Sequence, residues 1–398
     1  MDIRERMKAL FLSKTSDGAQ WAALLARYIG HHGVDIFAVL PKESGSCVGY
    51  WQECAREIYY LDLNIRDVHF MGIRGKVKSL TKLISDIKPD IIHSFFFDST
   101  ILARLALKHD LDIPCAFHVP GPLHLENKIT RMIDVKMSGQ RDYWIASSSY
   151  TYELYKRTPI LQERLFKSYL GIEIEKVKDK LIEEDSKKQA LRDEMGIPSE
   201  KIILMNASMF YPPKWWIGQR VGIKNHERLI MSIKYILKER DDLCLVLAGK
   251  QWGKGKRYES YLRKMAGYVG KDNIIFIGFL EQEKLWEVFN IADIIVHTPI
   301  SENCGGIIEP ALLNKPAIVS PVGGLTEIVE EGITGWITRS KSANDIAIKI
   351  LEVIEKRDEW EEKGRRLKEK VQKMFDIGKT SNEVIDIYKR IISFQDCR

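Results

Sequence analysis

Two carboxylates and a pair of glycines stand close together in the last quarter of the chain. Glu302 and Glu309 are seven residues apart, and Gly305 and Gly306 lie between them. If a helix begins near Gly305, its first amide groups point outward with no side chain in the way, and such a helix start binds anions. Carboxylates accept hydrogen bonds from sugar hydroxyls. The segment therefore predicts a site for a diphosphate with hydroxyl groups on either side, and a solvated glycine loop with two ordinary glutamates is the alternative.

Residues elsewhere in the chain have types and positions that suit the same chemistry. Lys224, in Ile-Lys-Asn-His, stands where a helical pattern begins, and it either meets a phosphate or is a surface lysine. Gly18 follows the first apolar run and lets backbone amides approach an anion. His118 ends another apolar run, and the Val-Pro-Gly-Pro after it would hold the imidazole at the mouth of a cleft, a purely structural histidine being the alternative. We expect His93 to be buried and structural.

The elements that position these residues follow from the pattern of the whole chain. Short apolar runs alternate with amphipathic helical patterns, which indicates parallel sheets covered by helices, so the predicted fold class is α/β. The predicted strands are Lys8 to Leu12, Asp35 to Val39, Asp90 to Phe95, Pro114 to His118, Asp142 to Ala146, Leu165 to Tyr169, Ile202 to Asn206, Leu243 to Ala248, Ile274 to Ile277, Asp293 to His297 and Ala317 to Ser320.

A charged stretch interrupts this alternation near the middle of the chain. The alternation stops after Leu170 and starts again with the predicted strand at Ile202. We therefore predict two doubly wound, Rossmann-like domains, residues 1–170 and residues 171–377. Ligands bind beyond the carboxyl ends of the strands in open α/β sheets, so the two domains are expected to face a central cleft.

The composition excludes several classes of protein. Of 398 residues, 45% are apolar and 29% charged, which excludes disordered and fibrous chains. The 61 Lys and Arg against 55 Asp and Glu give a net charge of +6, too evenly spread for a dedicated nucleic-acid binder. No stretch approaches the ~20 apolar residues that span a bilayer. The N-terminus lacks the pattern of a secretory signal, so we expect a cytoplasmic protein.

The cysteines give no sign of a metal site. All six are widely scattered, and they form neither a CxxC pair nor a Cys/His spacing suited to zinc. We expect reduced thiols, as is usual in a reducing compartment. No metal and no resident cofactor are predicted.

The segment from Glu302 to Ile337, ENCGGIIEPALLNKPAIVSPVGGLTEIVEEGITGWI, resembles the E-x7-E signature region of family 4 retaining glycosyltransferases with the GT-B fold. Its VGG, TEIV, EG and TGW elements follow in the family's order, and a weaker likeness extends over nearly the whole chain. The resemblance implies a hexosyltransferase-type enzyme that transfers a sugar from a nucleotide-diphosphate sugar to an acceptor hydroxyl, with retention of configuration. It implies a place in glycan, polysaccharide or glycolipid biosynthesis.

The resemblance also assigns roles to the two predicted domains. Residues 1–170 would bind the acceptor and residues 171–377 the nucleotide-sugar donor. A C-terminal helix, within residues 378–398, would pack back on the first domain. The implied partners are the donor and a glycan, lipid-linked or small-molecule acceptor, and no nucleic acid.

The family's functional residues map onto particular positions of this chain. The resemblance assigns catalytic roles to His118, Lys224 and Glu302, with His118 and Glu302 on the donor sugar. Lys224 and the amides of Gly305 and Gly306 would hold the diphosphate, and Glu309 the ribose hydroxyls. Further residues proposed to bind substrate are Gly18, Ile307 and Arg220, together with His124 on the acceptor side.

The chain departs from the family pattern where phosphate is bound. The family places an arginine after the first strand of the second domain, and Asn206 to Met209 contain none. An insertion rich in Trp, Lys and Arg follows, in which Arg220 and Lys214 are the candidates to replace that arginine. Pro310 stands directly after Glu309, where proline is tolerated because it falls in the first helical turn.

Other functions fit the same scaffold. A sugar-nucleotide epimerase or a phosphorylase is one alternative, and a non-catalytic sugar-nucleotide-binding protein is another. The chain contains all three of the residues expected at the site, Glu302, Glu309 and Lys224, and this disfavours the non-catalytic alternative.

Basic residues gather between Arg66 and Lys88, where six basic residues accompany two acidic ones. Arg74, Lys76, Lys78 and Lys82 would lie near the start of a helix. Because each basic residue near an anionic leaflet contributes ~1 kcal/mol, these four predict a weak peripheral contact with the inner face of the cell membrane. A solvated helix face is the alternative.

Overall fold

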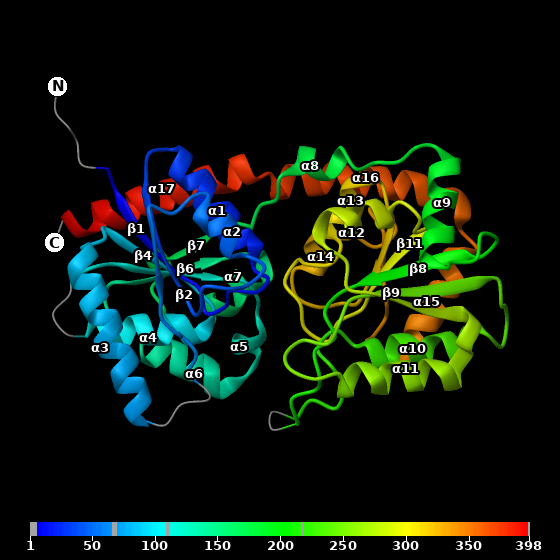
Figure 1. Ribbon diagram of the computed structural model, residues 1–398, viewed down its shortest axis with the longest axis horizontal. Helices are drawn as coiled ribbons and strands as arrows, with labels where there is room; N and C mark the ends of the chain where they lie inside the picture. The colour runs from blue at the N-terminus through cyan, green and yellow to red at the C-terminus, as the bar shows by residue number, and fades with distance from the viewer. Residues whose placement is uncertain (1–5, 66–69, 109–111, 216–217, 397–398) are drawn as a thin grey trace. The chain divides into compact units, whose positions relative to one another are not determined.

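The computed structural model describes residues 6–65, 70–108, 112–215 and 218–396. The chain divides into two compact units: one consists of Met1–Ile172 and Phe375–Arg398, and the other of Glu173–Met374. Each unit is a parallel β-sheet covered by helices, a Rossmann-like arrangement. The fold class is therefore α/β, as the sequence predicts (Figure 1).

Among the described residues, the sheet of the first unit has seven strands in the order β3-β2-β1-β4-β5-β6-β7, all parallel. They are β1 (Lys8–Leu12), β2 (Asp35–Leu40), β3 (Glu57–Tyr60), β4 (Ile91–Phe95), β5 (Cys115–Val119), β6 (Asp142–Ala146) and β7 (Leu165–Lys167). The helices are α1 (Gln20–His31), α2 (Val48–Gln52), α3 (Phe70–Ile87), α4 (Phe97–Leu107), α5 (Leu123–Glu126), α6 (Lys128–Lys136), α7 (Ser149–Lys156) and α17 (Ile377–Asp396).

Two cores flank this sheet. Apolar residues of α1, α2 and α17 pack on one side, against alternate residues of β1, β2 and β4. Apolar residues of α3 and α4 pack on the other side, against the intervening residues of the same strands. Figure 1 shows the two groups of helices on opposite sides of the strands. Burial on both sides explains why strands such as β1 and β2 are nearly continuous apolar runs in the sequence.

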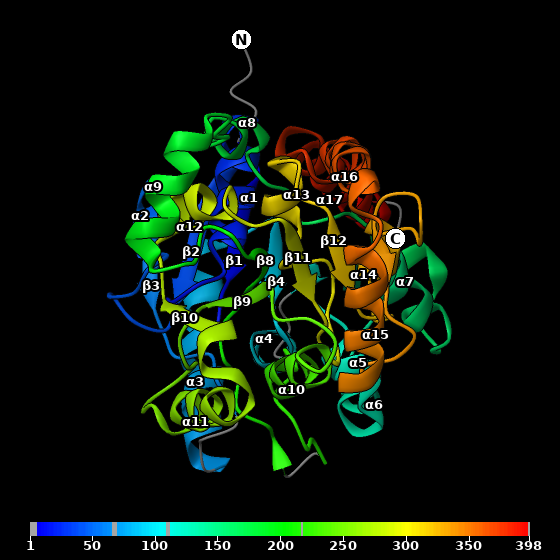
Figure 2. The ribbon, with the colours of Figure 1, turned by 90° about the vertical axis from the view of Figure 1, so that its right-hand side faces the viewer.

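The second unit has a six-stranded parallel sheet within the described part of the chain, in the order β10-β9-β8-β11-β12-β13. Its strands are β8 (Ile202–Ala207), β9 (Leu243–Ala248), β10 (Ile274–Gly278), β11 (Ile294–His297), β12 (Ala317–Val319) and β13 (Trp336–Ile337). Its helices are α8 (Ile174–Lys178), α9 (Asp185–Met195), α10 (His226–Ile236), α11 (Arg257–Gly270), α12 (Gln282–Phe289), α13 (Ile308–Leu312), α14 (Leu325–Ile328), α15 (Ala343–Ile354) and α16 (Trp360–Phe375). Helices α10, α11 and α15 contribute to one core beneath the sheet (Figure 2).

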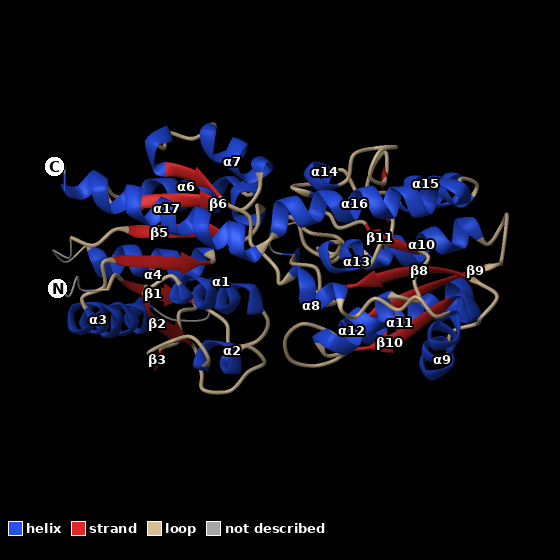
Figure 3. Ribbon diagram, turned by 90° about the horizontal axis from the view of Figure 1, so that it is seen from above, coloured by secondary structure: helices blue, strands red, loops and turns tan. Residues whose placement is uncertain are grey.

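The last helix, α17, belongs to the first unit and packs against α1 (Figure 3). Its Tyr388 is fully buried, and the hydroxyl is hydrogen-bonded to Nδ1 of His93 on β4. Burial holds the pKa of His93 well below its usual range, so this histidine is neutral and structural, as predicted. No helix among the described residues is long and apolar enough to span a bilayer.

The contact between Tyr388 and His93 generates a prediction about stability. Tyr388→Phe removes the hydrogen bond and leaves His93 Nδ1 buried without a partner, which should cost ~1–3 kcal/mol of the free energy of unfolding. Urea denaturation measures this cost. The matched control is Tyr268→Phe on α11, where the side chain is 80% exposed and the same change should have no effect. Equal unfolding midpoints for the two variants would contradict the structural role of Tyr388.

Candidate functional site

Three charged or polar side chains meet at the carboxyl edge of the second sheet. Lys224 lies on the loop between β8 and α10, His297 ends β11, and Glu302 lies on the loop that follows. The Lys224 ammonium forms an ion pair with Glu302 Oε2, and His297 Nε2 lies 3.2 Å from the same oxygen. The backbone N–H of Asn303 donates to Glu302 Oε1 at 3.0 Å. The structure therefore brings together two of the three predicted catalytic residues, Lys224 and Glu302.

The electrostatics of this cluster keep Glu302 ionised. Only 12% of its side chain and 18% of the Lys224 side chain are exposed, so burial opposes the charge on Glu302. The Lys224 ammonium and the hydrogen bond from His297 outweigh that burial and lower the pKa of Glu302 to about 2. Glu302 is thus a carboxylate at neutral pH, able to accept hydrogen bonds but not to act as a general acid.

His297 is a member of the cluster that sequence reasoning missed. Its ring is buried, and burial lowers its pKa. The Asn206 side-chain amide lies 3.5 Å from His297 Nδ1 and donates to the Val296 carbonyl at 2.8 Å, which holds Asn206 beside the ring. Nδ1 therefore accepts and Nε2–H donates to Glu302. The signal in the sequence was a polar residue at the end of an apolar strand, where ligands bind in open α/β sheets.

Two glycines allow the Glu302 loop to lie against its neighbours. A Cβ at Gly306 would lie 2.6–2.9 Å from the His297 ring, and a Cβ at Gly323 would lie 1.6 Å from the Glu302 carbonyl oxygen. Both glycines have positive φ, 84° and 52°. Side chains at these two positions would displace His297 and Glu302, because a Cβ would overlap the ring and the carbonyl oxygen.

The predicted helix start near Gly305 is wrong. Helix α13 begins at Ile308, with the fully buried Ile307 as its N-cap, and Gly305 and Gly306 lie in the turn before it. The positive φ of Gly306 is the reason, since the right-handed helix requires negative φ. The glycine amides therefore belong to a turn that follows Glu302, and Pro310 lies in the first helical turn, where it is tolerated.

Glu309 lies on α13, after this turn. Its side chain is half-buried, and burial raises its pKa above the usual value. Among the described residues, no ion pair joins Glu309 to a cation. The structure thus places the two predicted carboxylates in different environments: Glu302 is paired and strongly acidic, whereas Glu309 is a weaker acid.

Tyr211, on the same loop as Lys224, adds a hydroxyl close to the cluster. Burial and the charge of Glu302 raise the pKa of Tyr211 to about 12, so its hydroxyl keeps its proton at neutral pH.

The two candidates for the family's arginine lie farther along this loop. Arg220 is exposed and forms no ion pair with the described residues, and the backbone of Lys214 makes a turn with Gln219. Neither is joined to Glu302 by an ion pair between described side chains.

Three predicted site residues belong to the first unit. Gly18 follows β1 with φ of 67°, and its N–H donates to Ser46 Oγ at 2.9 Å, so this amide has a protein partner.

His118, expected at the mouth of a cleft, is instead fully buried on β5. Its ring lies over Phe95, and its Nε2 donates to the Ser168 carbonyl at 3.1 Å. The reason is its register: His118 pairs with Phe95 and lies within the sheet, one residue before the strand ends.

Burial lowers the pKa of His118 to about 4, so the ring is neutral at pH 7. Because Nε2 carries the proton that bonds Ser168, Nδ1 is left as the acceptor. Nδ1 is buried and has no hydrogen-bond partner among the described residues. His118 therefore presents one acceptor atom in a defined tautomer.

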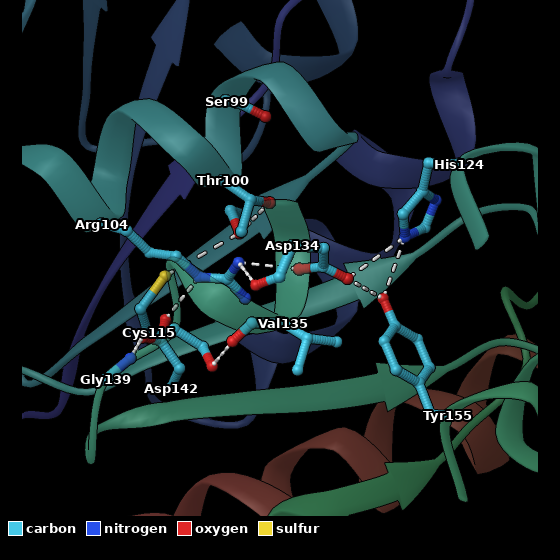
Figure 4. A network of polar contacts seen from close by, with 12 residues as sticks. Ser99, Thr100, Arg104, Cys115, His124, Asp134, Val135, Gly139, Asp142 and Tyr155 are labelled. Atoms are coloured by element: carbon cyan, nitrogen blue, oxygen red, sulfur yellow. Dashed lines mark hydrogen bonds and ion pairs between the residues drawn. The ribbon is translucent and has the colours of Figure 1, made fainter. Parts of the chain in front are cut away.

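His124, expected on the acceptor side, joins a buried polar network (Figure 4). Its Nε2 lies 3.0 Å from the Tyr155 hydroxyl and 3.4 Å from Asp134 Oδ2. Asp134 also accepts from the Tyr155 hydroxyl at 2.7 Å and from Arg104 Nη1 at 2.7 Å. Burial opposes the charge of Asp134, but Arg104 outweighs it and holds the pKa of Asp134 far below its usual value. The network fixes α5 and α6 to α4 and gives His124 a structural role.

No group of three or more His, Cys, Asp or Glu that could hold a metal ion is found in the part of the chain that the structure describes. The charges in the cluster are those of the Lys224 ammonium and the Glu302 carboxylate.

Comparison with known proteins connects this cluster to a family. Residues 216–374, which include Lys224, Glu302 and Glu309, match the family model of glycosyl transferases group 1. Spore coat protein SA of Bacillus subtilis is 20% identical over 59% of this chain and 61% of its own length. An uncharacterized glycosyltransferase of Methanocaldococcus jannaschii, MJ1069, is 27% identical over 56% of this chain and 52% of its own length. The matched regions thus span about half to three fifths of these relatives.

The fold is shared with solved structures over nearly the whole chain. The Anabaena protein Alr3699/HepE, solved in complex with UDP and glucose, superposes with a TM-score of 0.79 and 16% sequence identity, covering 96% of this chain and 99% of that one. This likeness establishes the GT-B class of fold, with two parallel-sheet Rossmann-like domains.

The ion pair between Lys224 and Glu302 generates a prediction with a pH dependence. The folded-state pKa of Glu302 lies below its unfolded value of ~4.3. The ion pair therefore stabilises the protein fully above pH ~4.3, and this stability is lost as the pH falls toward about 2. Lys224→Met should cost ~3 kcal/mol at pH 7, since it leaves a buried carboxylate without its cation. The pKa of Glu302 then rises, so the deficit should narrow as pH falls from ~7 to ~5.

Urea denaturation at several pH values measures this deficit. Lys234→Met on α10, an exposed residue, is the control and should be nearly neutral throughout. A deficit for Lys224→Met that does not change with pH would contradict the assigned ionisation of Glu302.

Proposed function

We propose that this protein is a retaining glycosyltransferase that transfers a sugar from a nucleotide-diphosphate sugar to an acceptor hydroxyl. The observation that carries the proposal is the cluster of Lys224, His297 and Glu302 at the carboxyl edge of the second sheet. This cluster lies inside the region that matches glycosyl transferases group 1. The complex of the Anabaena protein with UDP and glucose supports a nucleotide-sugar as the donor.

The donor's diphosphate would be held by Lys224 and by the amides of the turn at Gly305 and Gly306. Lys224 is held in place by Glu302, so its ammonium needs little reorganisation when a phosphate arrives. In the proposed complex, Glu309 accepts hydrogen bonds from the ribose. Glu309 lies on α13, after the glycine turn, whereas Glu302, the carboxylate proposed to contact the reacting sugar, lies before that turn.

Glu302 would accept hydrogen bonds from hydroxyls of the donor sugar. Its pKa of about 2 makes it a permanent acceptor at neutral pH, so it orients the sugar rather than protonating the leaving group.

The transfer itself would need no protein nucleophile. In the proposed reaction, the bond between the sugar and the diphosphate breaks, and the acceptor oxygen forms its bond on the same side of the sugar. The leaving diphosphate takes the acceptor's proton. Negative charge develops on the phosphates, and the Lys224 ammonium and the turn amides stabilise it. Since these groups supply the positive charge, we propose that the reaction proceeds without a metal ion.

The proposal includes the cellular setting that the sequence suggested. We place the enzyme in the cytoplasm, in glycan, polysaccharide or glycolipid biosynthesis, with a hexose as the transferred sugar. The first unit would bind the acceptor. A sugar-nucleotide epimerase and a phosphorylase are the alternatives on the same fold, and they differ in their products: an epimerase releases an altered nucleotide-sugar, and a phosphorylase consumes phosphate.

A donor screen tests the proposal directly. UDP-, GDP- and ADP-sugars are added separately, and the melting temperature is recorded, since a ligand at 100 times its dissociation constant adds ~2.7 kcal/mol. The donor that stabilises the protein is then incubated with candidate acceptors. Release of the nucleoside diphosphate and a glycoside of unchanged anomeric configuration are expected. An inverted product would contradict retention.

The different environments of the two carboxylates generate a prediction for turnover and binding. Glu309→Gln should weaken nucleotide binding, whereas Glu302→Gln should mainly lower kcat, because Glu302 contacts the reacting sugar. Each loss of a hydrogen bond to a charged group costs ~1.5–3 kcal/mol, or about ten- to 150-fold. Titration calorimetry with the nucleoside diphosphate and steady-state kinetics separate the two effects. Glu361→Gln, an exposed residue of α16, is the control. Wild-type kinetics in both site variants would show that the assignment is wrong.

A further inference from the structure

The loops that follow β8 and β9 lie side by side and form one surface. The Phe210 N–H donates to the Lys250 carbonyl at 2.9 Å, and the Trp252 N–H donates to the Phe210 carbonyl at 3.1 Å. The rings of Tyr211 and Trp252 are in contact, with centroids 5.4 Å apart. These contacts hold the insertion that the sequence shows after β8 against the glycine-rich loop after β9.

The two loops carry basic residues and no acidic ones. Neither residues 208–224 nor residues 249–258 contain Asp or Glu. Their basic residues are Lys214, Arg220, Lys224, Lys250, Lys254, Lys256 and Arg257. The first acidic residue after the second loop, Glu259, is engaged by Arg263 and by the backbone N–H of Gln251. Lys224 is paired with Glu302, and the other basic residues make the surface cationic, although the whole chain has a net charge of only +6.

Large aromatic side chains stand among these cations. Trp215 is 78% exposed and Trp252 is 38% exposed. We give the name cationic-aromatic surface to six exposed residues of the two loops: Trp215, Lys250, Trp252, Lys254, Lys256 and Arg257.

We propose that the cationic-aromatic surface docks on a phospholipid bilayer that contains anionic lipids. Lys and Arg are attracted to the negative surface of such a bilayer. Indole rings settle at the level of the lipid headgroups, where the apolar ring leaves water and the N–H stays hydrated. The indole of Trp215 is 78% exposed, as this mode of binding requires.

The arrangement of the rings favours a bilayer over single-stranded nucleic acid. Nucleic acid binding uses open ring faces on which successive bases stack. Here Lys250 Nζ lies 3.7 Å from the centre of the Phe279 ring, and Tyr211 and Trp252 lie against each other. The described residues of this surface therefore form no row of open ring faces, whereas insertion into headgroups requires only that the indole be exposed.

The structure also distinguishes this surface from the patch that the sequence suggested on α3. Lys76, one of the four residues of that patch, forms an ion pair with Asp62 at 2.6 Å and donates to the Asn64 carbonyl at 2.7 Å. Its charge is already neutralised within the protein. The cationic-aromatic surface lies on the second unit, and the inference does not depend on the proposed sugar transfer.

Co-sedimentation of the full chain with vesicles tests the proposal. Vesicles of phosphatidylcholine with phosphatidylglycerol should pellet the protein at low ionic strength, and vesicles of phosphatidylcholine alone should not. Trp215→Ser should lower the partition coefficient about tenfold, since part of the indole no longer leaves water. The double variant Lys254→Gln/Lys256→Gln should lower it about 25-fold, at about fivefold for each charge.

Matched variants separate this surface from non-specific binding. Tyr268→Ser removes an equally exposed aromatic residue from α11, and Lys78→Gln/Lys82→Gln removes two exposed charges from α3. Both should bind vesicles like the wild type. The proposal is overturned if anionic vesicles do not pellet the protein, if the α3 variant loses binding instead, or if a single-stranded RNA oligonucleotide displaces the protein from vesicles. The melting temperature with the donor checks that the variants still bind it, so a failed docking surface is distinguished from a failed transferase.

Discussion

The candidate site depends on keeping one carboxylate ionised in a place with little water. Glu302 is 12% exposed, and an unpaired charge at such a position would be neutralised or would unfold the loop. Lys224, on a separate loop 78 residues earlier in the chain, supplies the positive charge that keeps Glu302 ionised. His297 adds a hydrogen bond from the end of β11. The pair fixes both loops at once, so the same interaction that stabilises the site also preorganises an ammonium and a carboxylate for a ligand.

The close packing around this pair explains why the glycines are where they are. Gly306 lies against the His297 ring and Gly323 against the Glu302 carbonyl, and a side chain at either position would separate the members of the cluster. From the sequence, Gly305 and Gly306 were interpreted as an anion-binding helix start. Positive φ at Gly306 places them in a turn, and it moves the start of α13 to Ile308. The glycines therefore serve the carboxylate cluster as well as exposing their own amides.

Sequence reasoning was most successful where local pattern determines structure. Buried strands such as β1 and β9 were predicted at their observed bounds, because residues buried on both sides form continuous apolar runs. The edge strand β3, with exposed ends and only half-buried residues between them, has no such run and was missed. The roles of His118 and His124 depend on contacts distant in sequence, from Ser168 and from Tyr155 and Asp134. No local pattern could show that His118 is buried or that His124 belongs to a structural network.

The loop between β8 and Lys224 shows how the chain can change its surface without losing its site. Its first residues, up to Met209, contain no arginine at the place where the family pattern has one, yet both ends of the loop are held firmly. At one end Phe210 pairs with the β9 loop, and at the other the Gly222 N–H donates to the buried carboxylate of Glu227, at 3.0 Å from Oε1. Asn225, with φ of 61°, donates to the Thr298 carbonyl at 2.9 Å. Lys224 lies between these last two anchors, so its position does not depend on the residues farther back in the loop. The middle of the loop can therefore carry Trp215, which belongs to a different surface, while Lys224 and Glu302 stay together.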